Sequence, residues 1–231
     1  MTQASGTLKH FALFEGLSTA DLRALEQRCR IRRYARDTTI VDYQDSKTDV
    51  FFIVHGQVRV TIFSKAGREV AFRDLDHGEL FGELAAIDGK PRAANVIALT
   101  DCVLASMPES ALWDVLHQHQ SVAEAMLRRL ASNVRALTER VFEFSTLAVR
   151  NRIHAELLRL ARQSDKGTGP ITIAPMLTHA ELASRLSTHR EAVTRELAEL
   201  ARLGLIERSG PDLIIPDVEP LERLVANVDH E

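Results

Sequence analysis

The chain has 231 residues, which is long for one compact core and sufficient for two domains. Apolar residues make up 45% and charged residues 26%, so the composition excludes a disordered, collagen-like or fibrous protein. The formal net charge of -3 excludes a uniformly basic nucleic-acid-binding protein, so any basic surface must be local.

Cysteine use and hydropathy give expectations about the compartment. Cys29 and Cys102 lie far apart and outside any CxxC spacing, so no disulfide framework, thiolate metal site or iron–sulfur cluster is indicated. No stretch approaches about 20 apolar residues, and residues 1–13 lack the apolar core of a signal peptide. We expect a cytoplasmic protein without a metal or prosthetic group. Since no nucleophile–base pair is evident, we do not expect an enzyme.

Residues 31 to 107 predict an antiparallel all-β unit. Short apolar stretches alternate with glycines at near-regular spacing, which is typical of strands and turns, and a roll or barrel is the natural closure. The stretches are Val50–Val54, Val58–Phe63, Val70–Phe72, Val96–Ile97 and Val103–Leu104, and the glycines are Gly56, Gly67, Gly78 and Gly89. In front of them, Ser18 begins a capping-box-like motif that predicts a short scaffold helix.

The pattern changes after Ser110 to that of a long helix. Apolar residues now step by four and three, which predicts a heptad seam for a two-stranded coiled coil and therefore a homodimer. The seam residues are Ala123, Leu127, Leu130, Val134, Leu137, Val141, Phe144 and Ala148. A long helix packed only on its own β-unit is the alternative. Ser145 and Thr146 offer an N-cap for a new helix, and we expect a hinge there.

The last third of the chain predicts a helix-turn-helix followed by a hairpin. Two capping-box motifs, Thr178–Glu181 and Thr188–Glu191, each begin a helix, with a tight turn near Ser187. The short apolar runs Leu203–Arg208 and Leu213–Ile215 predict the two strands of a wing. Residues 218–231 predict a short amphipathic helix.

The second of these helices has the chemistry of DNA reading. Its apolar stripe of Val193, Leu197 and Leu200 leaves polar side chains on the opposite face. Arginine matches the O6/N7 edge of guanine, and glutamate accepts from the amine of cytosine. The residues expected to contact DNA are Thr178, Thr188, His189, Arg190, Glu191, Thr194 and Arg195. Solvated neighbours on an ordinary surface helix are the alternative.

Phe81-Gly-Glu-Leu84 and the following Asp88-Gly-Lys-Pro-Arg-Ala-Ala94 have the chemistry of a sugar-phosphate site. The glycine exposes backbone N–H groups, Arg92 supplies positive charge for a phosphate, and Glu83 can bind a sugar hydroxyl. The alternative is a salt bridge between Glu83 and Arg92, with no ligand.

With these motifs, the chain resembles the cyclic-AMP receptor protein and FNR family over nearly its whole length, from Phe14-Glu-Gly-Leu17 to the wing. The resemblance implies an α+β fold with a cyclic-nucleotide-binding β-roll (1–117), a dimerisation helix (118–145) and a winged helix-turn-helix domain (146–231). It implies a transcription regulator that binds GTGA-like half-sites in a pseudo-palindrome as a homodimer. RNA polymerase is an implied partner, with residues 164–169 as a candidate contact.

The resemblance also implies how the effector is held. Glu83 would take the ribose 2′-hydroxyl and Arg92 the cyclic phosphate. The implied nucleotide-binding residues are Phe72, Arg73, Phe81, Gly82, Glu83, Leu84, Arg92, Ala93, Asn133, Leu137 and Thr138. In the family, a threonine and a serine of the long helix contact adenine, and the matching positions here are Leu137 and Thr138. Arg73 could instead donate hydrogen bonds to O6 or N7 of guanine. The family resemblance ranks cAMP first and leaves cGMP open. A ligand-independent regulator of the same family is the alternative.

Overall fold

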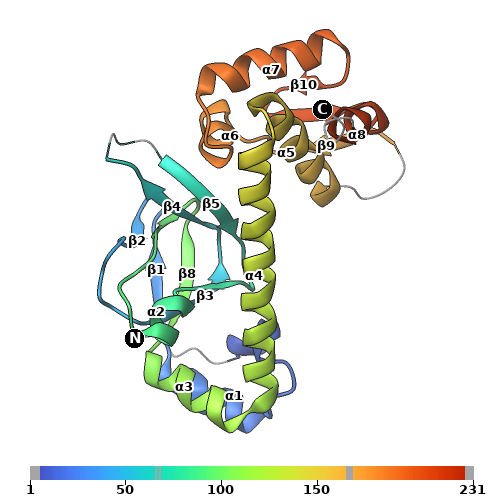
Figure 1. Cartoon of the computed structure of the whole chain (residues 1–231). Coiled ribbons are helices and arrows are strands. Elements are labelled where there is room, and N and C mark those ends of the chain that lie inside the picture. The colour runs from blue at the N-terminus through green and yellow to red at the C-terminus, as the bar shows by residue number, and fades with distance from the viewer. Residues whose placement is uncertain (1–5, 66, 68, 165–168, 227–231) are drawn as a thin grey trace. The chain divides into compact units, whose positions relative to one another are not determined.

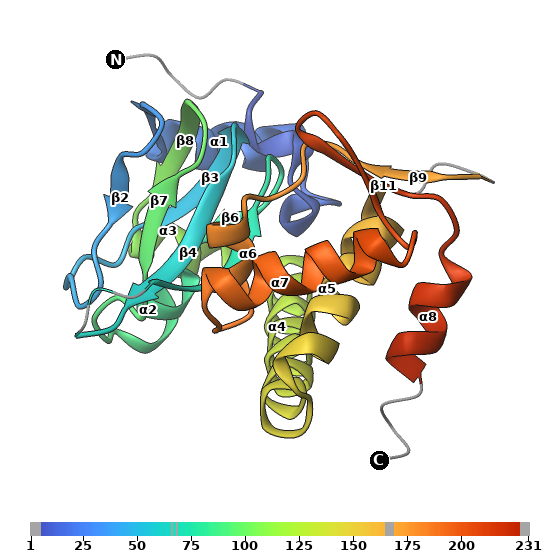
Figure 2. The same ribbon diagram turned by 90° about the horizontal axis from the view of Figure 1, so that it is seen from above.

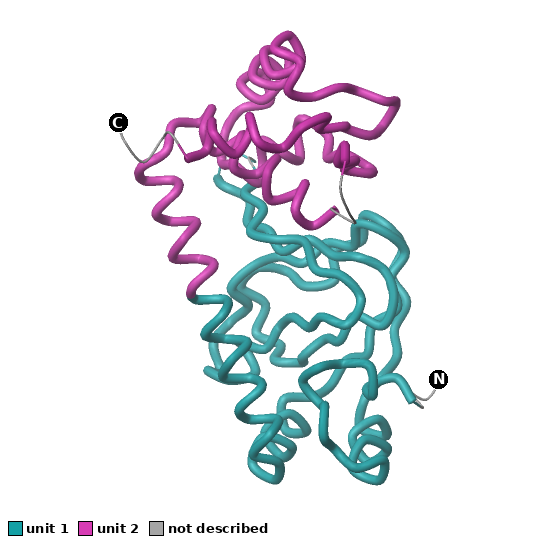
Figure 3. Tube along the Cα trace, turned by 90° about the vertical axis from the view of Figure 1, so that its right-hand side faces the viewer, with its two compact units in different colours: residues 1–134 teal, residues 135–231 magenta. Residues whose placement is uncertain are grey.

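The computed structural model describes residues 6–65, 67, 69–164 and 169–226. The chain divides into two compact units, residues 1–134 and 135–231, shown in teal and magenta in Figure 3. The boundary falls inside the long helix α4 (Gln120–Thr146). Antiparallel sheets and helices occur in both units, which confirms the α+β class. The three-part division expected at residues 117/118 and 145/146 stays a prediction.

The first unit contains a β-roll of two four-stranded antiparallel sheets (Figure 1). The strand orders are β1-β8-β3-β6 and β2-β7-β4-β5. The strands are β1 (Arg30–Tyr34), β2 (Thr39–Val41), β3 (Val50–His55), β4 (Val58–Phe63), β5 (Glu69–Leu75), β6 (Leu80–Phe81), β7 (Asn95–Ala98) and β8 (Cys102–Met107). The expected all-β unit is therefore present. Gly56 makes the β3–β4 turn with φ of 91°, where a Cβ would lie 2.5 Å from the carbonyl oxygen of Asp101.

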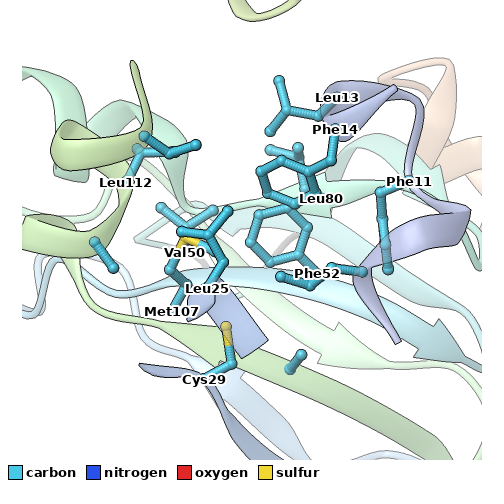
Figure 4. Packing of buried hydrophobic residues seen from close by; sticks show 14 of the residues in the cluster. Phe11, Leu13, Phe14, Leu25, Cys29, Val50, Phe52, Leu80, Met107 and Leu112 are labelled. Carbon is cyan, nitrogen blue, oxygen red and sulfur yellow. The ribbon is translucent and has the colours of Figure 1, made fainter. Parts of the chain in front are cut away.

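Helices at one end of the roll enclose an aromatic and aliphatic core (Figure 4). Phe52 is fully buried, and the rings of Phe11 and Phe14 each lie 5.2 Å from it, centroid to centroid. The enclosing elements are η1 (Leu8–His10), η2 (Ala12–Phe14), α1 (Thr19–Arg28) and α3 (Glu109–Gln118). The oxygen of Ser18 accepts from the backbone of Asp21, so the expected helix start is confirmed.

Helix α4 carries two different stripes. On one, Val122 and Met126 are buried in the core of the first unit. On another, four apolar side chains of the expected seam are at least half exposed: Leu127, Val134, Leu137 and Val141. The helix thus packs on its own roll and still presents an exposed apolar seam.

The end of α4 corrects one expectation. The hydroxyls of Ser145 and Thr146 donate to the carbonyl oxygens of Val141 and Phe142, both at 2.8 Å, so neither residue caps a new helix. Inside a helix, Ser and Thr commonly bond to the carbonyl four residues back, and here they stay in α4. The break comes at residues 147–148, before α5 (Val149–Ser164).

The second unit packs helices against a small sheet. The helices are α5, α6 (His179–Arg185), α7 (Arg190–Arg202) and α8 (Glu219–Ala226), and the strands are β9 (Ile171–Ile173), β10 (Glu207–Ser209) and β11 (Asp212–Ile215). The expected wing is the hairpin β10–β11, although β10 begins at Glu207 and the predicted strand residues 203–206 form a turn instead. Strand β9 joins the hairpin as a third strand (Figure 2). Most of the expected polymerase contact at 164–169, and the end of the expected tail helix, lie outside the described residues.

Two further observations concern the described ranges only. None of their helices combines the length and apolarity needed to cross a bilayer. Nor do three or more His, Cys, Asp or Glu side chains there gather in a way that can hold a metal ion.

Candidate functional site

Gly82 forms the junction between strand β6 and the short helix α2 (Glu83–Asp88). Its φ of 86° lies in the left-handed region, which disfavours residues with a side chain. A Cβ at this position would lie 2.7 Å from Nη1 of Arg92 and 2.9 Å from the carbonyl oxygen of Asp49. Glycine is therefore required both for the backbone conformation and for the close approach of Arg92.

Arg92 is only 3% exposed, and its guanidinium is held by two backbone carbonyls. Nη1 donates to the oxygen of Gly82 at 3.0 Å, and Nη2 donates to the oxygen of Asp49 at 2.7 Å. Nε is buried without a hydrogen-bond partner. Burial lowers the pKa of Arg92, while the carboxylates of Asp49, Asp45 and Glu83 oppose that shift.

Glu83 is the buried carboxylate of the cassette. It is 5% exposed, and within the described residues it accepts no hydrogen bond and forms no ion pair, so the alternative of a Glu83–Arg92 salt bridge is wrong. Its charge acts on two nearby guanidinium groups, those of Arg92 and Arg129. Because a buried carboxylate is costly without hydrogen bonds, this acceptor is suited to a donor supplied by a ligand.

Arg129 is a residue that the sequence analysis missed. It extends from α4, and its Nη2 donates to the carbonyl oxygen of Leu80 at 2.6 Å, while Nε is buried without a partner. Burial lowers its pKa, an effect that Glu83 opposes. Arg129 follows the buried Met126 by three residues and the buried Val122 by seven. This helical spacing is the sequence signal that could have placed Arg129 on the stripe facing the roll.

Arg73 and Asn133, both expected nucleotide contacts, touch each other. Nη1 of Arg73 on β5 donates to Oδ1 of Asn133 on α4 at 2.7 Å. Asn133 lies one turn after Arg129, on the same stripe of the helix. The roll and this stripe of α4 therefore share a cluster with three arginines and one buried carboxylate: Arg73, Arg92, Arg129 and Glu83.

The remaining expected nucleotide contacts differ in their surroundings. Phe81 is buried and stacks on Phe51, whereas Leu84 is 50% exposed and Ala93 is exposed. Phe72 is half-buried on β5. Leu137 and Thr138 lie further along α4, in the second unit, and are exposed.

A separate cavity of about 110 Å³ also reaches Arg92. It opens among strands β1 to β3 and the loop before β3, and its lining residues are Arg32, Tyr34, Ile40, Val41, Asp45, Lys47, Asp49, Phe51 and Arg92. Because it includes neither Glu83 nor Arg129, it is distinct from the cluster around the carboxylate.

The second unit contains a helix-turn-helix formed by α6 and α7. Thr178 and Glu181 form a complete capping box at the start of α6, as expected. Ser187 has φ of 50°, which confirms the tight turn. The second expected capping box is wrong: His189 is the N-cap of α7, and Thr188 is 9% exposed with its N–H bonded to the oxygen of Ala183. Counted from the N-cap His189, Glu191 is the second residue of the helix, whereas a capping box needs its acidic side chain at the third.

Helix α7 separates its apolar and polar side chains as expected. Val193, Leu197 and Leu200 are buried in the core of the second unit. The exposed residues of the expected DNA-reading set are His189, Arg190, Glu191, Thr194 and Arg195. Thr178 is also exposed, at the start of α6. Of the expected DNA contacts, only Thr188 is withdrawn from the surface.

His179, a second residue that the sequence analysis missed, links α6, α7 and the wing. Its Nδ1 lies 2.7 Å from Oγ1 of Thr194, and its Nε2 lies 3.2 Å from Nη2 of Arg208. Because the Thr194 hydroxyl donates to the oxygen of Arg190, Nδ1 of His179 carries the proton and Nε2 accepts from Arg208. Burial lowers the pKa of His179, and Arg208 and Arg190 lower it further.

The two units therefore define a class of protein in which a β-roll with a polar interior cluster is joined to a winged helix-turn-helix. Family models agree with this class. A cyclic nucleotide-binding domain matches residues 31–119, and a Crp-like helix-turn-helix domain matches residues 151–224.

Individual relatives match most of the chain. A CRP-like cAMP-activated global transcriptional regulator of Mycobacterium tuberculosis is 26% identical over 217 residues, covering 94% of this chain and 97% of the relative. The cAMP-activated global transcriptional regulator Vfr of Pseudomonas aeruginosa is 28% identical over 191 residues, covering 81% and 89%.

Solved structures have the same fold. A CRP-family transcriptional regulator of Thermus thermophilus has a TM-score of 0.67 at 29% identity, covering 84% of this chain and 96% of that one. A CooA mutant from Carboxydothermus hydrogenoformans has a TM-score of 0.79 at 19% identity, covering 97% of this chain and 96% of that one. At this identity the similarity shows the fold alone. The chain belongs to the CRP/FNR family of DNA-binding transcription regulators, with a cyclic nucleotide-binding domain and a helix-turn-helix domain.

Proposed function

We propose that this protein is a homodimeric, sequence-specific transcription regulator whose affinity for DNA is controlled by a 3′,5′-cyclic nucleotide bound in the β-roll. The observation that carries the proposal is Glu83, a buried carboxylate with no hydrogen-bond donor within the described residues. It lies within the electrostatic influence of Arg92 and Arg129, each of which has a buried Nε without a partner. Such a cluster suits a ligand that carries both hydroxyl donors and an anion.

Each cluster residue has a distinct role in the proposal. Glu83 accepts the ribose 2′-hydroxyl, and Arg92 supplies charge to the cyclic phosphate. Arg129 supplies positive charge beside Glu83 and joins α4 to strand β6 through the oxygen of Leu80. The other residues proposed to bind the nucleotide are Phe72, Arg73, Phe81, Gly82, Leu84, Ala93 and Asn133 in the first unit. Leu137 and Thr138 on α4 remain part of the same prediction. The names of the relatives specify cAMP, which supports a 3′,5′-cyclic nucleotide as the effector class, with cAMP first and cGMP as the alternative.

The exposed seam of α4 supports a homodimer. Leu127, Val134, Leu137 and Val141 repeat with heptad spacing and are at least half exposed. Burying such a stripe against a second copy removes apolar surface from water and forms a two-stranded coiled coil. Two copies place two reading helices at one pseudo-palindromic site.

DNA reading is assigned to α7. Arg190, Glu191 and Arg195 are exposed on the face opposite the core, and they would read a GTGA-like half-site through base edges in the major groove. His189, Thr194 and Thr178 would contact the flanking backbone, and the buried Thr188 would position the turn. Because nearby glutamates offset the arginines of the helix-turn-helix, affinity would depend on the paired phosphate contacts of the dimer and fall steeply with salt.

Isothermal titration calorimetry of the full-length protein with cAMP, cGMP and 5′-AMP tests the effector half of the proposal. A cyclic nucleotide is expected to bind once per protomer, and 5′-AMP is the comparison ligand that lacks the cyclic phosphate. If neither cyclic nucleotide binds while a palindromic duplex does, the protein is a ligand-independent regulator of the same family and the effector assignment is wrong.

A further inference from the structure

The contact between Arg73 and Asn133 fixes which atoms of the asparagine remain for a ligand. Nη1 of Arg73 lies 2.7 Å from Oδ1 of Asn133, and both side chains are half-buried. A guanidinium has hydrogen-bond donors and no acceptor, so the amide must present its oxygen to Arg73. The NH2 group of Asn133 therefore points away from Arg73, and one of the two lone pairs of the amide oxygen is already engaged.

The surface formed by this pair offers more donors than acceptors. Within the described residues, the NH2 group of Asn133 and the other N–H groups of Arg73 have no hydrogen-bond acceptor. Arg129 adds positive charge nearby, and its pKa is lowered mainly by burial and to a smaller extent by Arg73. A partner that satisfies this surface must present at least two acceptors on one edge.

Purine bases differ in this respect. The O6/N7 edge of guanine carries two acceptors, whereas the corresponding edge of adenine carries one acceptor and the donor amine N6. Adenine would place its amine against donors and leave one of the protein's N–H groups unpaired. Leaving a buried polar group unpaired is what makes hydrogen-bonded sites selective.

We propose that Arg73 and Asn133 read the base of the effector and select a 6-oxopurine, so that the protein prefers cGMP to cAMP. This inference rests on the proposed function and specifies the base bound at the same site. It reverses the ranking implied by relatives named as cAMP-activated.

Calorimetry of the full-length protein with cGMP, cAMP and cyclic inosine monophosphate tests the inference. Cyclic inosine monophosphate has the O6 and N7 atoms of guanine but lacks the 2-amino group. The inference predicts similar dissociation constants for the cGMP and inosine ligands, and affinity for cAMP that is lower by roughly 5-fold to 100-fold. If cAMP binds as tightly as cGMP or tighter, the inference is wrong and the proposed function stands. If none of the three binds, both are wrong.

Asn133→Asp separates base reading from general electrostatics. Aspartate keeps an acceptor for Arg73 but replaces the NH2 donor with a second acceptor, which suits the N6 amine of adenine. The ratio of cGMP to cAMP affinity should fall by roughly tenfold. Ser132→Asp is the matched control, since it adds the same charge at the neighbouring exposed position on α4. Equal changes of the ratio in both variants would overturn the inference.

Discussion

Arg92 donates from Nη1 to the carbonyl oxygen of Gly82 at 3.0 Å, and that guanidinium occupies the space where a side chain at residue 82 would begin. The contact ties the loop before β7 to the junction of β6 and α2. It explains why the cassette requires both a glycine and an arginine ten residues later.

Gly82→Ala should destabilise the fold more than Gly89→Ala. Both glycines have positive φ, 86° and 67°, so both substitutions carry the cost of the left-handed conformation, about 1–2 kcal/mol. Only at residue 82 does the new Cβ also meet Arg92 and a carbonyl oxygen, whereas at residue 89 it meets nothing within 4 Å. Urea unfolding should show an additional loss for Gly82→Ala of roughly 1 kcal/mol or more. Equal losses would show that the contact with Arg92 adds nothing.

Glu83→Ala should abolish discrimination against a ligand that lacks the 2′-hydroxyl. If Glu83 accepts that hydroxyl, the wild-type protein binds a 2′-deoxy cyclic nucleotide more weakly than its parent, by about 1.5–3 kcal/mol for a hydrogen bond to a charged group. The variant should bind both ligands equally weakly in calorimetry. Discrimination that survives in Glu83→Ala would assign the hydroxyl to another residue.

Leu137→Glu should dissociate the dimer. The substitution places a charge on the exposed apolar seam, where burial against a second copy would desolvate it. Sedimentation should show a monomer at micromolar concentration. Leu203→Glu is the control, because Leu203 is similarly exposed, at 48%, but lies outside the seam. A dimer that tolerates Leu137→Glu would exclude the α4 seam as its interface.

Glu191→Ala should relax specificity at one base position of each half-site. The exposed carboxylate is assigned to a cytosine amine, so its loss should reduce discrimination there by about 1–3 kcal/mol. Binding to a panel of duplexes with single substitutions measures this directly. A uniform loss across all duplexes would make Glu191 a structural residue.

His179 should make folding stability sensitive to pH. Its folded pKa is lowered from the ordinary value of 6.5, so the neutral ring is favoured in the native state. The resulting stability is fully present above the unfolded pKa and is lost as the pH falls through the lowered folded pKa. Between pH 7.5 and pH 5, the melting temperature measured by calorimetry should fall less for His179→Gln than for the wild type. Parallel curves of melting temperature against pH would mean that protonation of His179 does not affect folding stability.

The elements with a clear periodic pattern were predictable from the sequence. Strand β4 has the predicted bounds Val58–Phe63, and the buried face of α7 is the predicted stripe of Val193, Leu197 and Leu200. Helix caps were predicted less reliably, because Ser and Thr side chains can either cap a helix or bond to a carbonyl oxygen within it. Thr178 caps α6, whereas Ser145 and Thr146 bond back within α4 and Thr188 is buried in the turn.

The site was predictable where neighbours in sequence are neighbours in space, as in the cassette of Gly82 and Glu83. Arg129 and His179 were missed because their roles come from tertiary contacts, with Leu80 in one case and with Thr194 and Arg208 in the other. Strand β9 was missed because its three residues pair with β11, about forty residues later in the chain.

Control of DNA binding by a cyclic nucleotide can be measured by fluorescence anisotropy with a GTGA-containing palindromic duplex. The dissociation constant of the full-length protein should fall about tenfold or more on addition of saturating cyclic nucleotide, and by linkage the duplex should tighten nucleotide binding by the same factor. The effect should be absent for a scrambled duplex. Equal affinity for the palindrome with and without cAMP or cGMP would show that the nucleotide does not control DNA binding.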